Sequence, residues 1–265
     1  MRNNLLSLVL VLFAQLGFSQ ASLNLTLAGH INPPSDLNDV WGYVDGINNK
    51  EYAICGVMAG GEIIVDVTNP SSPQIVQTLP GISSTWRDLK VWGSYAYITN
   101  ESGNGLRVID LSNLPNSVLY KDTIIHGMNS AHNLYIDNGF AYVVGPDIAN
   151  GGMVFLDLSN PWHPAYAGEY NTHYIHDVYV RNDIAYAGEL SNGLTLINVA
   201  NKSNPVILAN RQYQGNFTHN TWLNDAGTVC FTTDEVSAGK ITAFDISNLN
   251  NIDLLDEIQS SLSTN

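Results

Sequence analysis

The segment IIVDVTNP at residues 63–70 decides the fold, because close relatives of it return four times along the chain. They read LRVIDLSN at 106–113, VFLDLSNP at 154–161, TLINVANK at 195–202 and TAFDISNL at 242–249. Their polar anchors are Asp66, Asp110, Asp157, Asn198 and Asp245, with spacings of 44, 47, 41 and 47 residues. A period of that size matches four short strands and their turns, which is one blade of a β-propeller.

Each repeat divides into four strands, A to D, at Gly, Asn, Asp and Pro residues. Strand A is expected at 39–44, 88–92, 133–136, 177–180 and 220–223, strand B at 52–55, 96–99, 141–144, 185–187 and 229–232, and strand D at segments such as 74–79, 118–124 and 206–213. Strand C carries the anchor segment and follows a glycine in every repeat. In strands A to C, apolar residues occupy both the odd and the even positions. This pattern indicates sheets that are buried on both faces, as in radially packed blades.

These patterns predict an all-β propeller with five visible four-stranded blades, near residues 38–79, 87–124, 132–170, 176–213 and 219–258. A β-sandwich is the structural alternative, but it does not predict a repeat of this length. Residues 22–31 resemble strand D and are expected to form the outer strand of a closing blade, which would remove an open sheet edge. The fifth repeat has its own strand D at 252–258, so one strand is left over. We therefore expect an incomplete six- or seven-bladed ring with further blades after Asn265; the alternative is a closed five-bladed ring in which one terminal segment is not a strand.

The first twenty residues have the pattern of a secretory signal peptide. Arg2 precedes an apolar stretch at 5–13 that is too short to span a bilayer, and small and polar residues follow at 17–21. We expect the mature chain to be 21–265 and to be secreted, extracellular or attached to a cell surface. No later apolar run is long enough for a transmembrane segment, so any anchor would belong to a missing C-terminal region.

The composition is acidic, with 24 Asp and Glu against 10 Lys and Arg, a net charge of −14 and a pI near 4.6. This balance argues against nucleic acid as a partner and favours cations or cationic groups. Cys55 and Cys230 each lie in an apolar strand pattern, which predicts two small buried side chains and no disulfide framework.

The repeated strand C, with IIVD at 63–66 and LRVID at 106–110, resembles the LVIVD repeat of bacterial and archaeal surface proteins. Together with SAHN at 130–133 and IHDV at 175–178, it is similar to the choice-of-anchor B family over about residues 30–250. The resemblance implies an exported β-propeller tethered by a C-terminal anchor. It implies no particular biochemical activity.

One constellation of residues suggests chemistry. Each strand A starts with a polar pair, and the ends of strand B carry carboxylates that should reach the same rim, because the two strands run antiparallel. The expected ligand-binding ring at the channel mouth comprises Asp39, Arg87, Asp88, His132, Asn133, His176, Asp177, His219, Asn220, Glu101, Asp147, Glu189, Asp234 and Glu235.

Imidazole and carboxylate groups together suit a divalent metal, so His132, His176 and His219 are candidate ligands for Zn²⁺ or Mn²⁺, while carboxylates and amides alone would suit Ca²⁺. The alternative is a structural lock copied by duplication, in which the polar pairs satisfy backbone groups at the channel. Arg87 would either clamp a substrate carboxylate or act as a counterion for the acidic mouth.

Two functional hypotheses follow. In the first, the chain is a non-enzymatic binding or scaffold propeller whose acidic, His-rich mouth takes a small molecule, a glycan or a cell-surface protein. In the second, it is a metal-dependent hydrolase or lyase that uses the ring of histidines and carboxylates. The sequence leaves the ligand open, and no catalytic residue is assigned.

Overall fold

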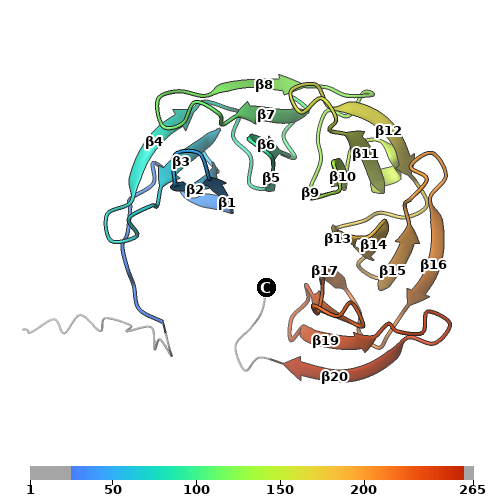
Figure 1. The fold of residues 1–265 in the computed structure, drawn as a ribbon. Coiled ribbons are helices and arrows are strands. Elements are labelled where there is room, and N and C mark those ends of the chain that lie inside the picture. Colours follow the sequence, from blue (N-terminus) through green and yellow to red (C-terminus); the bar gives the residue numbers. More distant parts are fainter. Residues whose placement is uncertain (1–24, 260–265) are drawn as a thin grey trace, which may run out of the picture.

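The computed structural model describes residues 25–259, whose strands form five four-stranded antiparallel sheets (Figure 1). The strands are, sheet by sheet, β1 (Leu37–Asp45), β2 (Lys50–Val57), β3 (Glu62–Asp66) and β4 (Gln74–Leu79); β5 (Leu89–Trp92), β6 (Tyr95–Ile98), β7 (Leu106–Asp110) and β8 (Leu119–Thr123); β9 (Asn133–Asp137), β10 (Phe140–Val144), β11 (Met153–Asp157) and β12 (Ala165–Tyr170); β13 (Asp177–Arg181), β14 (Ile184–Gly188), β15 (Leu194–Asn198) and β16 (Val206–Arg211); β17 (Thr218–Leu223), β18 (Val229–Asp234), β19 (Lys240–Asp245) and β20 (Asp253–Gln259). A single 3₁₀ turn, η1 (Ala149–Gly151), interrupts this pattern within the described chain.

The sheets fan around a common axis, as the repeat predicts. Strands β1, β5, β9, β13 and β17 lie innermost, and β4, β8, β12, β16 and β20 lie on the outside (Figure 1). The radial arrangement confirms the propeller and excludes the β-sandwich. The expected strands agree with the observed ones to within a few residues, and 74–79 matches β4 at both ends.

The anchor residue of each repeat closes a turn directly after strand C. Its side-chain oxygen accepts a hydrogen bond from the backbone N–H two residues later, which is an Asx-turn. The five bonds are Thr68 to Asp66 (2.9 Å), Ser112 to Asp110 (2.9 Å), Ser159 to Asp157 (2.7 Å), Ala200 to Asn198 (3.0 Å) and Ser247 to Asp245 (2.9 Å). The same turn therefore ends strand C in all five repeats and directs the chain toward strand D.

The core lies between the sheets and not within any one of them. Leu106 and Leu156 belong to one cluster that joins the second and third sheets, whereas Phe155 and Ile197 belong to the next cluster along the arc. Strand β11 is buried on both faces for this reason, whereas β8 on the outside is largely exposed. Both cysteines are buried and free, as expected.

The N-terminal segment differs from the expectation. Residues 25–31 form no strand, and Ile31 instead packs on the face of the first sheet against Cys55, Val57 and Ile63. A closing strand needs a neighbouring sheet edge for its hydrogen bonds, and the described residues offer none at this position. Residues 1–20, expected to be a signal peptide, and residues 22–24 lie outside the described residues.

The five sheets form an open arc, with a gap between the first and the fifth (Figure 1). The alternative of a closed five-bladed ring is therefore wrong, and completion of a larger ring stays a prediction. Within residues 25–259, no helix has the length and apolar character needed to cross a membrane.

Candidate functional site

Three histidines lie side by side at one end of the inner strands. His132 and His176 each directly precede an inner strand, and their backbone N–H groups donate to Val144 and Gly188 at the ends of the adjacent strands, at 3.1 and 2.9 Å. His219 occupies the equivalent place in β17. The ring centroids of His132 and His176 are 4.1 Å apart, and those of His176 and His219 are 4.4 Å apart. Three residues separated by more than forty positions each in the sequence thus form one row.

Two carboxylates join this row. Glu101 follows β6, and its Oε1 lies 2.7 Å from Nδ1 of His132. Glu235 follows β18, and its Oε2 lies 3.7 Å from Nε2 of His176 and 4.0 Å from Nε2 of His219. The mouth pocket, as we call it, is a cavity of about 300 Å³ lined by Trp86, Glu101, His132, Tyr174, His176, His219 and Glu235.

Burial keeps the central imidazole neutral. Desolvation lowers the pKa of His176 to about 3, with smaller contributions from His132 and His219. Desolvation also lowers the pKa of His219, although Glu235 opposes the shift. Nδ1 of His176 is buried without a partner of good hydrogen-bond geometry within residues 25–259, although the backbone of His219 lies close enough to the ring to oppose the fall in its pKa.

One subset of the mouth pocket has the spacing of a metal site. Each of His176, His219 and Glu235 offers a ligand atom, and these three atoms lie within 4.8 Å of one another. His132, expected as a third imidazole ligand, is instead held by Glu101. The structure therefore replaces the predicted trio of histidines with two histidines and a carboxylate.

The second residue of each polar pair lies deeper along the axis and not at the mouth. A separate cavity of about 220 Å³, which we call the channel tier, is lined by the predicted residues Asp39, Asp88, Asn133, Asp177 and Asn220. Residues two positions further along the inner strands, among them Trp41, Lys90, Tyr135 and Trp222, line it too. Side chains alternate along a strand, so only every second residue faces the axis.

Two carboxyl groups of the channel tier are perturbed by burial. Desolvation raises the pKa of Asp88 to about 7, against the opposing charge of Lys90, whose Nζ lies 2.5 Å away. Desolvation raises the pKa of Asp177 to about 6, although the N–H of Val178 donates to it at 2.6 Å. Asn220 donates a further hydrogen bond to Asp177 from the neighbouring sheet. This last hydrogen bond ties the fourth and fifth blades together.

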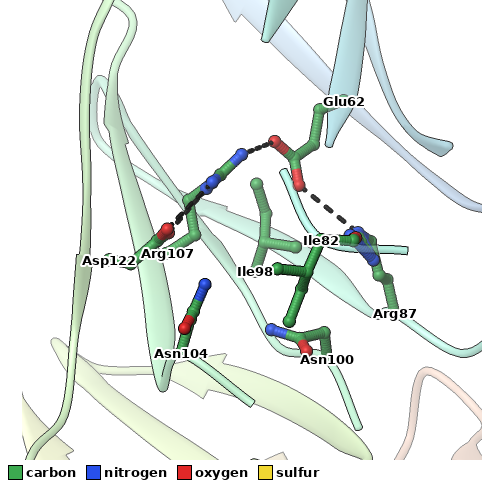
Figure 2. Close-up of a pocket in the computed structure, with 8 residues that line it drawn as sticks. All are labelled: Glu62, Ile82, Arg87, Ile98, Asn100, Asn104, Arg107 and Asp122. Atoms are coloured by element: carbon green, nitrogen blue, oxygen red, sulfur yellow. Dashed lines mark hydrogen bonds and ion pairs between the residues drawn. The ribbon is translucent and has the colours of Figure 1, made fainter. Parts of the chain in front are cut away.

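Arg87 does not reach the mouth. Figure 2 shows Glu62 between the guanidinium groups of Arg87 and Arg107, which lie 3.5 and 2.6 Å from its carboxylate oxygens. Arg107 also makes a bidentate pair with Asp122, at 2.7 and 3.0 Å. The cavity here is about 10 Å³, room for one water at most. This ion-pair network joins the first two blades and leaves Arg87 no access to a ligand.

Three predicted carboxylates also lie away from the mouth pocket. Glu189 is buried and accepts hydrogen bonds from Tyr170 at 2.9 Å and Thr195 at 2.7 Å. Asp234 accepts from Tyr213 at 2.7 Å and from the N–H of Phe217 at 2.9 Å, and Asp147 accepts from the loop N–H groups of Asn129 and Ser130. Each of these carboxylates closes a loop or joins neighbouring segments. Position in the repeat alone could not show that they have this structural role and do not line the mouth pocket.

The two aromatic walls of the mouth pocket were not part of the predicted ring. Trp86 is 54% exposed and Tyr174 is 39% exposed, and both line the pocket. Both stand one or two positions before a polar pair, so an aromatic residue directly before that pair is the sequence signal that would have found them.

Comparison with known proteins agrees with this architecture. The family model described as LVIVD repeat matches residues 49–79, 85–121, 129–172 and 174–211, together more than half of the chain. The chain belongs to the LVIVD repeat family. The four matches fall on the first four blades of the LVIVD propeller. No curated protein matches the sequence.

Solved structures show the same fold at low identity. A functionally unknown protein from Desulfotomaculum acetoxidans has a TM-score of 0.67 and 13% identity, with 89% of this chain and 74% of that chain covered. A putative 6-phosphogluconolactonase from Bacteroides uniformis has a TM-score of 0.63 and 10% identity, with 82% and 71% covered. The Cps50 (Swd1) β-propeller domain of Myceliophteria thermophila has a TM-score of 0.54 and 14% identity, with 79% and 69% covered. At these identities the likeness concerns the fold alone.

Proposed function

We propose that this LVIVD propeller is an exported binding module of the choice-of-anchor B type, whose mouth pocket takes a small molecule or the terminal unit of a glycan. The observation that carries the proposal is the convergence of Glu101, His132, His176, His219 and Glu235 on one cavity beside two exposed aromatic walls. These polar groups come from four different blades, so the pocket depends on the assembled arc. The leader-like pattern of residues 1–20 supports export.

The lining suggests how such a ligand would be held. Trp86 and Tyr174 offer flat apolar faces on which a sugar ring or an organic cation can stack. Glu101 and Glu235 are 44% and 45% exposed and can accept hydrogen bonds from hydroxyl or ammonium groups. The combination fits a polyhydroxylated or cationic ligand better than an anionic one.

A glycan array and a panel of primary amines, tested against wild-type protein and Trp86→Ala, examine this proposal. A true occupant of the mouth pocket should lose roughly tenfold or more in affinity in the variant, since buried Trp contacts are frequent hot spots. Trp92→Ala is the matched control, because Trp92 is a partly exposed tryptophan that does not line the mouth pocket. Binding that Trp86→Ala leaves unchanged, or no binding to any probe at millimolar concentration, would contradict the proposal.

A second candidate is a metal-dependent hydrolase or lyase. It is favoured by the His132–Glu101 pair, which lies beside the metal-type cluster and could act as a general base, because the carboxylate orients the imidazole. Under this hypothesis Glu101→Gln should lower kcat and leave metal content unchanged. Equal turnover by the wild type and the variant on every hydrolysable substrate would count against it.

A further inference from the structure

We propose that His176, His219 and Glu235 bind one divalent first-row transition ion, with Zn²⁺ as the best fit, and that the ion leaves a coordination position open toward the mouth pocket. The inference deepens the proposed function, since the ion would lie in the same pocket. It specifies the ligand chemistry further: a group with an oxygen or nitrogen donor that can complete the coordination shell.

The spacing of the three side chains suits a single ion. Atoms separated by no more than 4.8 Å all lie within about 2.8 Å of a common point, against about 2.0–2.2 Å for Zn²⁺ bonds to nitrogen and oxygen. Shifts of less than about 1 Å would complete the site. Glu235 can supply most of this movement, because its side chain is 45% exposed and follows the end of β18.

Both imidazoles are prepared for coordination. A histidine binds a metal through a ring nitrogen, and both rings place Nε2 near Oε2 of Glu235, at 3.7 and 4.0 Å. The backbone of His176 is fixed by its hydrogen bond to Gly188, so the ring position does not depend on an ion.

The donor set selects the class of ion. Two imidazoles and one carboxylate suit Zn²⁺, Mn²⁺ or Fe²⁺, whereas Ca²⁺ requires six to eight oxygen ligands, of which this cluster has one carboxylate. Three protein ligands are typical of zinc sites that keep a position for water or substrate, while structural sites use four. The remaining side of the ion would face Trp86, Tyr174 and the cavity of about 300 Å³.

His132 would lie outside the ligand set. Its Nδ1 is engaged by Glu101 at 2.7 Å, and its ring stands 4.1 Å from that of His176. In this place it can hydrogen-bond a molecule that coordinates the ion. The structure thus distinguishes His132 from the other two histidines, although all three occupy the same place in the repeat.

The test is a calorimetric titration of Zn²⁺ alone into untagged, chelator-stripped full-length protein, with the visible absorption of added Co²⁺ as a second readout of coordination geometry. We expect one ion per chain, and roughly 100-fold weaker binding for His176→Ala, His219→Ala and Glu235→Gln, at least the loss seen for outer-shell partners. His132→Ala should bind within about threefold of the wild type, because the larger losses of outer-shell partners come from hydrogen bonds to the ligands, whereas His132 hydrogen-bonds Glu101 and meets His176 only ring to ring. His163→Ala is a control for a histidine outside the mouth pocket.

Each outcome bears on the inference. No Zn²⁺ binding by a wild-type protein with a normal melting temperature would overturn it, as would loss of binding in His132→Ala with retention in Glu235→Gln. Circular dichroism and thermal melting without metal establish that each variant folds. In a variant that melts normally, the Co²⁺ absorption spectrum then shows whether the substituted residue is a ligand. A glycan or amine probe that binds in EDTA but loses binding in Trp86→Ala would leave the proposed function standing while the metal inference failed.

Discussion

At the residue scale, similar polar residues in the repeat have separate tasks. Asp66 and its four counterparts each close a turn through one hydrogen bond to the chain two residues on. Arg87 stands at the place of the mouth histidines in the repeat but is buried beside Glu62, which also pairs with Arg107. Burial and partners decide the role of a polar side chain, and residue type alone does not.

The network in Figure 2 yields a stability prediction. Arg107→Met should destabilise the protein by about 3–5 kcal/mol, because Glu62 is 2% exposed and would lose its closest partner. Denaturant unfolding measures the change. Glu62→Gln should also destabilise the protein, because it leaves the buried guanidinium of Arg87 without a carboxylate partner. An Arg107→Met variant as stable as the wild type would disprove this account.

Asp88 predicts a pH dependence of stability. Its pKa rises to about 7 in the folded protein because of burial and of Asp39 and Asp177, with Lys90 opposing, whereas an unfolded Asp titrates near about 4. The folded state therefore holds the proton more tightly, and stability falls as pH rises from about 4 to 7, by at most about 1.4 kcal/mol per pH unit. Asp88→Asn should reduce the slope of the unfolding free energy against pH over that window, although the raised pKa of Asp177 keeps part of the slope below about pH 6. The exposed Asp225→Asn should leave the slope unchanged, and identical profiles for Asp88→Asn and the wild type would refute the assignment.

At the element scale, strand C is where backbone geometry is most demanding. The C and D strands pair with a one-residue irregularity in four sheets, for example between Phe155 and Leu156, while β7 and β8 pair without one. Such bulges increase local twist, which a sheet in a propeller needs. In the first four sheets the glycine before strand C allows the chain to pass close to the carbonyl oxygen at the end of strand D, as at Gly61, Gly105, Gly152 and Gly193.

Gly105 shows the cost of changing that entry. Its φ is +71°, and a Cβ there would stand 2.2 Å from the carbonyl oxygen of Thr123. Gly105→Ala should therefore destabilise the protein well beyond the roughly 1 kcal/mol of a positive φ alone. Gly93→Ala is the matched control, since Gly93 has a φ of +57° with open space around it. Equal melting temperatures for the two variants would show that the close contact relaxes without cost.

At the scale of the whole molecule, stability is shared between neighbouring blades. Each hydrophobic cluster from Tyr52 to Phe244 combines residues of adjacent sheets, apart from the one on the outer face of the first sheet. The third sheet has neighbours on both sides, whereas the first and fifth face the gap of the arc (Figure 1). A repeat protein with such nearest-neighbour contacts should not be uniformly stable.

Amide hydrogen exchange should show that the inner sheets of the arc are more stable than the terminal ones. We expect β11, in the third sheet, to exchange more slowly than β19, which has the same place in the fifth sheet, because opening β11 breaks two interfaces. Comparing equivalent strands controls for position within the sheet. Equal protection of β11 and β19 would indicate that the arc unfolds as one cooperative unit.

The amino-acid sequence by itself determined the blade, the number of visible blades and the strand limits, because the period of the anchor segment and the alternation of apolar residues are local properties of the chain. It also determined that His132, His176 and His219 share a place in the repeat. Only the tertiary structure decided which of these polar residues meet. Side-chain direction separated the mouth pocket from the channel tier, and ion pairs removed Arg87. Of the carboxylates expected at the rim, Glu101 and Glu235 reached the histidines, whereas Glu189, Asp234 and Asp147 took hydrogen bonds elsewhere. Such contacts join residues far apart in sequence, so they exist only once the blades have packed.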